Sequence, residues 1–130
     1  MKASPEEVTI SPGGTADAIV RLKIDNGFHV NANPPSFPYL KATELELTNA
    51  EGVSVSFTRY PEPLLKKFAF DDSPLAVYEG ETTLSVKLRA ERSTSPGRKN
   101  LSGKLRVQAC DDQVCYAPAA MDIAIPVNVK

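Results

Sequence analysis

The stretches LSGKLRVQA at residues 101–109 and MDIAIPVNV at residues 121–129 alternate apolar and polar side chains along most of their length. Such alternation is the pattern of a β-strand with one face on a core and the other in water. Between them lies the run CDDQVCYAP at residues 110–118, which holds both cysteines of the chain. The sequence therefore predicts two strands with the cysteine pair at the tip of the hairpin that joins them.

The same period of two recurs along the chain. Further alternating runs lie at residues 20–25, 44–47, 53–58 and 83–89, and a short strand is expected at residues 7–10. Turn sequences rich in Gly, Pro and Asn separate these runs, and no helical stripe of useful length is found. Seven or so short strands at this spacing predict an all-β fold, an immunoglobulin-like β-sandwich of two antiparallel sheets, with a small barrel as the alternative.

Two stretches, residues 31–39 and 61–74, read as neither strand nor tight turn. The second carries two Phe and two Leu in a segment that prolines interrupt. Long loops in a small domain are more often functional than idle. We therefore expect the apolar side chains of the second loop to cover another part of the protein.

Length and charge limit the classes of protein to consider. The chain has 130 residues and a net charge of −1, which fits one domain over residues 1–130 and argues against nucleic acid or an anionic membrane as partner. No apolar run has the length of a membrane span, and the N-terminal residues do not form a signal peptide. We expect a monomeric segment cut from a longer protein.

The cysteines alone leave two roles open. A disulfide between Cys110 and Cys115 would close a ring of about six residues, for which the loop-entropy estimate is about 2 kcal/mol, against about 4.7 kcal/mol for a loop of about 100 residues. Such a disulfide would stabilise the fold only weakly, whereas a cysteine pair at a hairpin tip is well placed for thiol–disulfide exchange. Structural and redox roles therefore remain equally open. No metal site is expected, because His29 is the only histidine beside the two cysteines.

Three other residues bear on the chemistry of the cysteines. Asp111 and Asp112 lie between them, and nearby anions disfavour a thiolate. His29 is either a proton acceptor near the sulfurs or, as we favour, a residue that orders its own Asn-rich loop by hydrogen bonds.

Four motifs resemble one family. They are GFHVNANPP at residues 27–35, YPEP at 60–63, VYEG at 77–80, and QAC at 108–110 followed by CYAP at 115–118. Together they resemble the N-terminal periplasmic domain of thiol:disulfide interchange protein DsbD, a family also described as disulfide-bond corrector domains. The resemblance covers nearly the whole chain and implies an immunoglobulin-like fold in which Cys110 and Cys115 form a catalytic disulfide that needs no cofactor.

The resemblance also implies a cellular setting and partners. A thiol:disulfide oxidoreductase of this family lies in the periplasm, takes electrons from a membrane-embedded donor domain and passes them to thioredoxin-like proteins, including disulfide isomerases, with a link to cytochrome c biogenesis. The mixed disulfide with the downstream partner would form on Cys115. The alternative is an extracytoplasmic β-sandwich that binds a partner and carries a purely structural disulfide.

Two further groups of site residues are expected, and the resemblance implies the first of them. A cap loop that shields the sulfurs maps to residues 68–73, with Phe68, Phe70, Asp71 and Asp72 as its members. We expect partner contacts from Tyr116, His29, Asn31 and Tyr39.

Overall fold

Two long antiparallel strands form the spine of the protein. In this computed structural model, which describes residues 1–68 and 73–130, strand β10 (Gly97–Val107) pairs with strand β12 (Ala119–Val129) along its whole length. Leu101 lies opposite Ile125 and Leu105 opposite Met121, so apolar side chains of both strands share one face. The alternation in the sequence therefore becomes one buried and one solvated face of a sheet.

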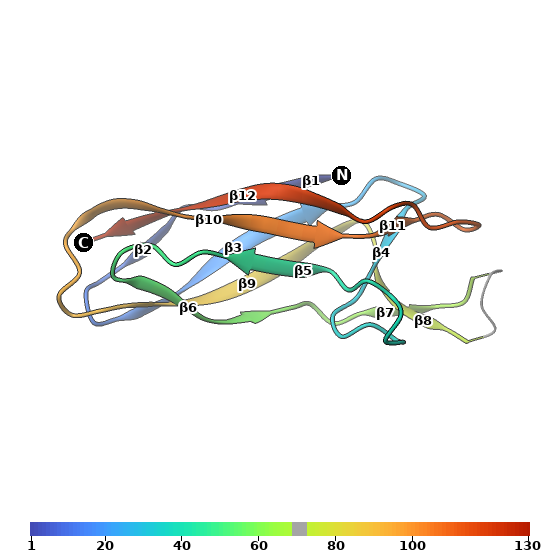
Figure 1. Cartoon of the computed structure of the whole chain (residues 1–130), viewed down its shortest axis with the longest axis horizontal. Helices are drawn as coiled ribbons and strands as arrows, with labels where there is room; N and C mark the ends of the chain where they lie inside the picture. Colours follow the sequence, from blue (N-terminus) through green and yellow to red (C-terminus); the bar gives the residue numbers. More distant parts are fainter. Residues whose placement is uncertain (69–72) are drawn as a thin grey trace.

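Two four-stranded sheets make up the body of the molecule (Figure 1). One has the order β2-β12-β10-β5 and adds β2 (Val8–Ile10) and β5 (Glu44–Leu47) to the spine. The other has the order β1-β3-β9-β6, with bounds Lys2–Pro5, Thr15–Lys23, Glu81–Ala90 and Val53–Arg59. The pairs are antiparallel except β2 with β12, which is parallel and departs from the predicted purely antiparallel sheets.

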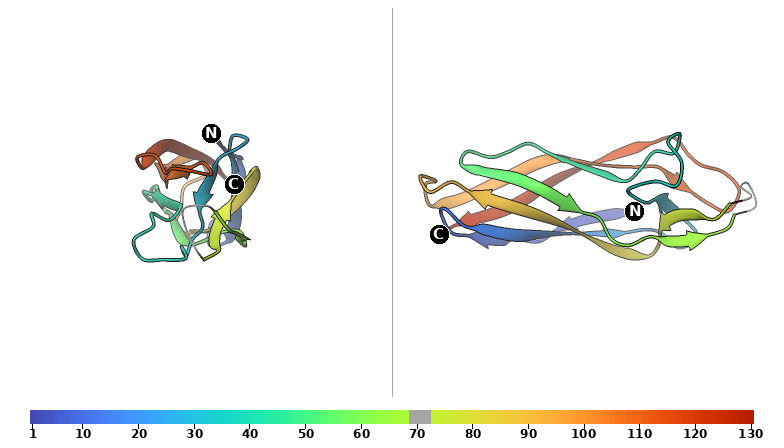
Figure 2. Two further views of the ribbon diagram at one scale, coloured as in Figure 1. Left: turned by 90° about the vertical axis from the view of Figure 1, so that its right-hand side faces the viewer. Right: turned by 90° about the horizontal axis from the view of Figure 1, so that it is seen from below.

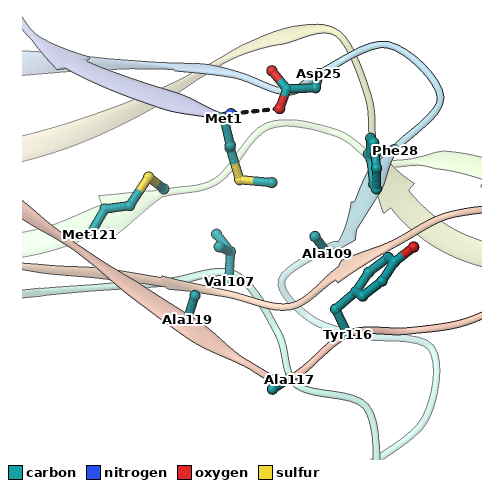
Figure 3. A pocket seen from close by; sticks show the side chains of 9 residues that line it. All are labelled: Met1, Asp25, Phe28, Val107, Ala109, Tyr116, Ala117, Ala119 and Met121. Carbon is teal, nitrogen blue, oxygen red and sulfur yellow. Dashed lines mark hydrogen bonds and ion pairs between the residues drawn. The ribbon is translucent and has the colours of Figure 1, made fainter.

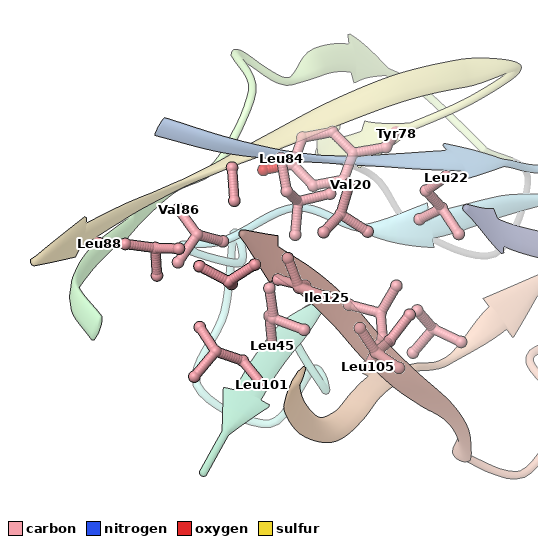
Figure 4. Packing of buried hydrophobic residues seen from close by; sticks show 14 of the residues in the cluster. Val20, Leu22, Leu45, Tyr78, Leu84, Val86, Leu88, Leu101, Leu105 and Ile125 are labelled. Atoms are coloured by element: carbon pink, nitrogen blue, oxygen red, sulfur yellow. The ribbon is translucent and has the colours of Figure 1, made fainter. Parts of the chain in front are cut away.

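The main core fills the space between these two sheets (Figure 4). Val20, Leu84 and Val86 from one sheet and Leu105 and Ile125 from the other are fully buried. Each such side chain contributes about 1.5–3 kcal/mol through removal of apolar surface from water. The predicted strands at residues 20–25, 44–47, 53–58, 83–89, 101–109 and 121–129, and the short strand at 7–10, are confirmed, with shifts at their ends.

A close approach of two backbones fixes where β5 lies. Gly103 of β10 is opposite Leu47 of β5. A Cβ atom on Gly103 would collide with the backbone carbonyl of Glu46, so only glycine lets the strands meet at this point.

A third, smaller sheet lies at one end of the molecule (Figure 1, Figure 2). Its order is β11-β4-β8-β7, with bounds Ala109–Cys110, His29–Asn31, Leu75–Tyr78 and Leu64–Lys66. Here the predicted two-sheet plan is incomplete, and the stretches predicted as long loops supply strands β4 (in part) and β7. The reason is that β4 and β8 are buried throughout and β7 is exposed throughout, so none of them alternates.

The described part of the chain is all-β, as predicted. Among its residues, no helix has the length and apolarity needed to cross a bilayer.

Candidate redox site

A disulfide joins Cys110 to Cys115 at the end of the molecule that carries the third sheet. The Sγ atoms are bonded at 2.03 Å, and the two Cα atoms lie 4.0 Å apart across an isolated β-bridge. Strand β10 leads in, β11 holds Cys110, and residues 111–118 lead out to β12. The predicted hairpin tip therefore carries a ring of six residues closed by its own sulfurs.

Hydrogen bonds from Asp111 shape the tip. Its Oδ1 accepts from the backbone N–H groups of Gln113 and Val114, both at 2.8 Å, and its Oδ2 accepts from the Tyr116 hydroxyl at 2.7 Å. The two backbone bonds, followed by the tyrosine bond, lower the pKa of Asp111 below its usual value, while the same carboxylate raises the pKa of Tyr116. Asp111 is thus an anion at neutral pH that holds the turn together.

The two sulfurs differ in access to solvent. Cys110 is completely buried, whereas Cys115 is exposed. Cys110 lies in β11, which pairs with β4. Cys115 lies in the segment between β11 and β12, and among the described residues this segment belongs to no strand of the three sheets. Of the two cysteines only Cys115 has exposed surface, so an approach to the disulfide from solvent is open on its side.

His29 lies directly across the β4–β11 pair from Cys110. Its imidazole is 1% exposed and stacks on the ring of Phe68, with 4.2 Å between ring centroids and 18° between planes. Burial lowers the pKa of His29, and this effect outweighs the opposing influence of Glu79, Asp112 and Asp111. His29 is therefore a neutral base at neutral pH, set beside the buried sulfur.

Asparagines order the loop that we expected His29 to order. The Asn31 amide donates to the Lys41 carbonyl at 3.0 Å, and the Asn33 amide donates to the Thr43 carbonyl at 2.9 Å. No side-chain hydrogen bond from His29 to this loop occurs within the described residues, and His29 lies on a strand rather than at a loop entry. The favoured interpretation of His29 is corrected accordingly.

The residues expected to meet a partner fall into two groups. Tyr39 and Tyr116 are exposed, and Tyr39 stacks on Phe37 at 5.4 Å. His29 and Asn31 are each 1% exposed, so a partner cannot touch them in this arrangement. Any contribution they make to exchange comes from beneath the surface.

The expected cap is described only at its start. Phe68 is 6% exposed and packs with Leu75 and Val77, next to Phe37 and Leu40. Through its stack on His29, Phe68 lies over the residue that faces Cys110. The other expected cap residues, Phe70, Asp71 and Asp72, lie outside the described residues.

An apolar groove of about 520 Å³ begins where the tip ends (Figure 3). Phe28 and Tyr116 lie together at one end of it, with 6.0 Å between ring centroids, and Val107, Ala109 and Ala117 are among the other residues that line it. The sequence did not single out this groove, because its lining comes from segments far apart in the chain, such as Met1, Phe28 and Met121.

A β-sandwich that carries a disulfide at a hairpin tip, with Cys110 buried and Cys115 exposed, has the features of an all-β thiol–disulfide exchange domain. The sequence model of the family described as "Thiol:disulfide interchange protein DsbD, N-terminal" matches residues 2–126. The chain belongs to this family, and the Cys110–Cys115 disulfide supports a role in thiol–disulfide exchange.

Solved structures agree on the fold. The N-terminal periplasmic domain of ScsB from Proteus mirabilis superposes with a TM-score of 0.60 at 20% identity, covering 97% of this chain and 44% of that one. The chain therefore spans less than half of that structure's length. The DsbD N-terminal domain of Neisseria meningitidis, in the reduced form, gives 0.57 at 18% identity, covering 85% and 77%. The predicted immunoglobulin-like sandwich is confirmed. A search of curated proteins found no match.

Opening the disulfide should leave the sandwich folded. Because the ring spans only six residues, we expect reduction to lower the free energy of unfolding by about 2 kcal/mol. The Leu105→Ala variant, which empties part of the main core, should lose about 2–5 kcal/mol in either redox state. Urea unfolding of oxidised and reduced protein measures both losses, and reduced protein that is unfolded without urea would contradict the expectation.

Proposed function

We propose that this domain relays reducing equivalents from a membrane-embedded donor to periplasmic thioredoxin-like proteins or disulfide isomerases. The observation that carries the proposal is the unequal access to the two sulfurs, with Cys115 exposed and Cys110 buried. Exchange needs an accessible sulfur to attack and a second sulfur to leave and return. The periplasmic setting is supported by the family and by the ScsB domain, which is described as periplasmic.

The relay would run through two exchanges. A donor thiolate attacks Cys115 Sγ, the S–S bond breaks, and Cys110 departs as a thiolate that takes up a proton. The donor's second thiol then closes the donor's own disulfide and frees Cys115. In the second exchange the Cys115 thiolate attacks the partner's disulfide, and Cys110 closes on Cys115 to release the partner with two electrons.

The charge around the tip makes the rate depend on the partner. Asp111 and Asp112 lie within the ring that the two sulfurs close, and within residues 1–68 and 73–130 neither carboxylate forms a salt bridge to a lysine or arginine. An anionic neighbour disfavours a thiolate, so reduced Cys115 is a weak nucleophile in isolation. A docking protein that covers these carboxylates or brings a cation would raise the rate.

A partner surface can be proposed around Cys115. Tyr116 and Val114 flank this cysteine and are exposed, and Tyr39 is exposed on the loop that follows β4. The apolar groove beside Tyr116 extends the same face (Figure 3). Tyrosine and apolar side chains of this kind supply much of the binding energy in protein interfaces.

Trapping on single-cysteine variants tests the relay. In Cys110→Ala, the Cys115 thiol remains but nothing can resolve its mixed disulfide, so a covalent complex with an oxidised thioredoxin-like protein should accumulate. In Cys115→Ala, the remaining sulfur is buried and little complex should form. Non-reducing gels and mass spectrometry measure both. An idle structural disulfide, the alternative function, predicts no complex with either variant.

Phe68 is proposed to act as a cap over the site. Phe68→Ala removes the ring that covers His29 and should speed reduction of the disulfide by glutathione about tenfold, a change of about 1.4 kcal/mol in barrier. Leu75→Ala is the matched control, because it weakens the same apolar cluster and keeps the ring on His29. Stopped-flow kinetics below the unfolding transition compare the variants. Equal rates for Phe68→Ala and wild type, or equal acceleration by Leu75→Ala, would reject the cap.

A further inference from the structure

His29 is the one imidazole of the chain, and the fold places it against the buried half of the disulfide. In an antiparallel pair, residues directly opposite each other project to the same face of the sheet. His29 of β4 and Cys110 of β11 are such a pair, and both are buried. The side chains of His29 and Cys110 therefore lie next to each other on one buried face.

The Nε2 atom of His29 is unsatisfied in the oxidised protein. It is buried and makes no hydrogen bond to any residue within 1–68 and 73–130. Buried polar atoms nearly always have a partner, so an exception at a reactive site calls for an explanation. A disulfide sulfur offers no proton to this nitrogen, whereas the thiol of a reduced Cys110 does.

The exchange chemistry requires a proton acceptor at this place. Cys110 must lose its S–H proton before it can attack Cys115, because the thiolate is the nucleophile. Burial disfavours the thiolate, and Cys110 has no exposed surface through which water could take the proton. A base inside the protein removes this obstacle.

We propose, on the basis of the exchange function above, that His29 is the base that accepts the Cys110 proton when the reduced pair closes. The S–H proton moves to Nε2, and the Cys110 thiolate attacks Cys115 Sγ. The bond from Cys115 to the partner's sulfur breaks, and the partner leaves as a thiolate with the electron pair. The imidazolium then gives its proton to that thiolate or to water. Phe68, stacked on the ring, holds the imidazole in position.

The surroundings of His29 favour its neutral imidazole, the form that can accept a proton. Burial lowers the pKa of His29 below 6.5, and Lys66 acts in the same direction. Glu79 of the turn after β8 and Asp112 and Asp111 of the tip act in the opposite direction, and Glu79 is itself paired with Lys66 at 2.8 Å. Ring closure should therefore be fully supported at neutral pH and be lost as pH falls through a pKa below 6.5.

Stopped-flow mixing of reduced protein with dithiobis-nitrobenzoate, a chromogenic disulfide, tests the proposal. Attack by Cys115 releases the first coloured thiolate in a bimolecular phase, and closure by Cys110 releases the second in a unimolecular phase. The variant His29→Phe keeps a flat ring against Phe68 and removes both nitrogens. We expect its second phase to be slower at neutral pH by on the order of 100-fold, as for loss of a general base, while the first phase stays unchanged.

The pH profile separates a base from a structural residue. In wild type the second phase should fall off below the pKa of His29, whereas in His29→Phe it should keep rising with pH as hydroxide removes the proton. Equal second phases and equal profiles would overturn the role of His29 and leave the exchange function intact. A wild-type protein with no second phase would instead overturn the exchange function, and the role of His29 with it.

A measurement on wild type alone guards against a variant that fails to fold. His29 gives the single set of imidazole resonances in the spectrum, since the chain has one histidine. Reduction of the disulfide should shift the Nε2 resonance and change the pKa of His29, because the Cys110 thiol becomes its hydrogen-bond donor. Identical titration curves for oxidised and reduced protein would contradict the proposal.

Discussion

The pairing of β11 with β4 is the contact on which the site depends. Only two residue pairs form it, Ala109 with Val30 and Cys110 with His29. These pairs bury one sulfur of the disulfide and leave Cys115 on the free side of the tip. The same pairing joins the hairpin to the small sheet that also holds β8 and β7. Phe68, which follows β7 in the chain, stacks on His29 of this sheet. The difference in burial between the two cysteines thus follows from backbone pairing rather than from the local sequence of the tip.

The core that stabilises the fold and the disulfide lie in different parts of the molecule. The main core lies between the two sheets β2-β12-β10-β5 and β1-β3-β9-β6 (Figure 4), and the hairpin tip that holds the disulfide lies at the end of the molecule, with β11 (Figure 1). A ring of six residues constrains the unfolded chain only weakly, so the disulfide can open and close at little cost to the fold. At the tip, Asp111 holds the turn through bonds to Gln113, Val114 and Tyr116 that do not involve the sulfurs. The turn can therefore keep its shape in both redox states.

The sequence alone predicted the sandwich because each of its main strands has one buried and one solvent-exposed face, which gives alternating apolar and polar residues. It also predicted the position of the cysteine pair, since residues 101–109 and 121–129 alternate so clearly. The third sheet escaped prediction because β4 and β8 are buried on both faces and β11 has only two residues. The apolar run Leu75–Tyr78, placed between Pro74 and the Glu79-Gly80 turn, is the one signal of a short buried strand that could have been used. The position of His29 opposite Cys110 is a matter of register between segments far apart in sequence, which periodicity does not contain.

Mapping the first mixed disulfide on the wild-type protein tests the unequal access of the two sulfurs most directly. Oxidised protein is mixed with reduced glutathione, quenched in acid at short times and digested, and the sulfur that carries glutathione is identified by mass spectrometry. Because Cys110 is buried and Cys115 is exposed, we predict that glutathione is found on Cys115 in large excess. Glutathione found equally on both cysteines, or chiefly on Cys110, would contradict the account.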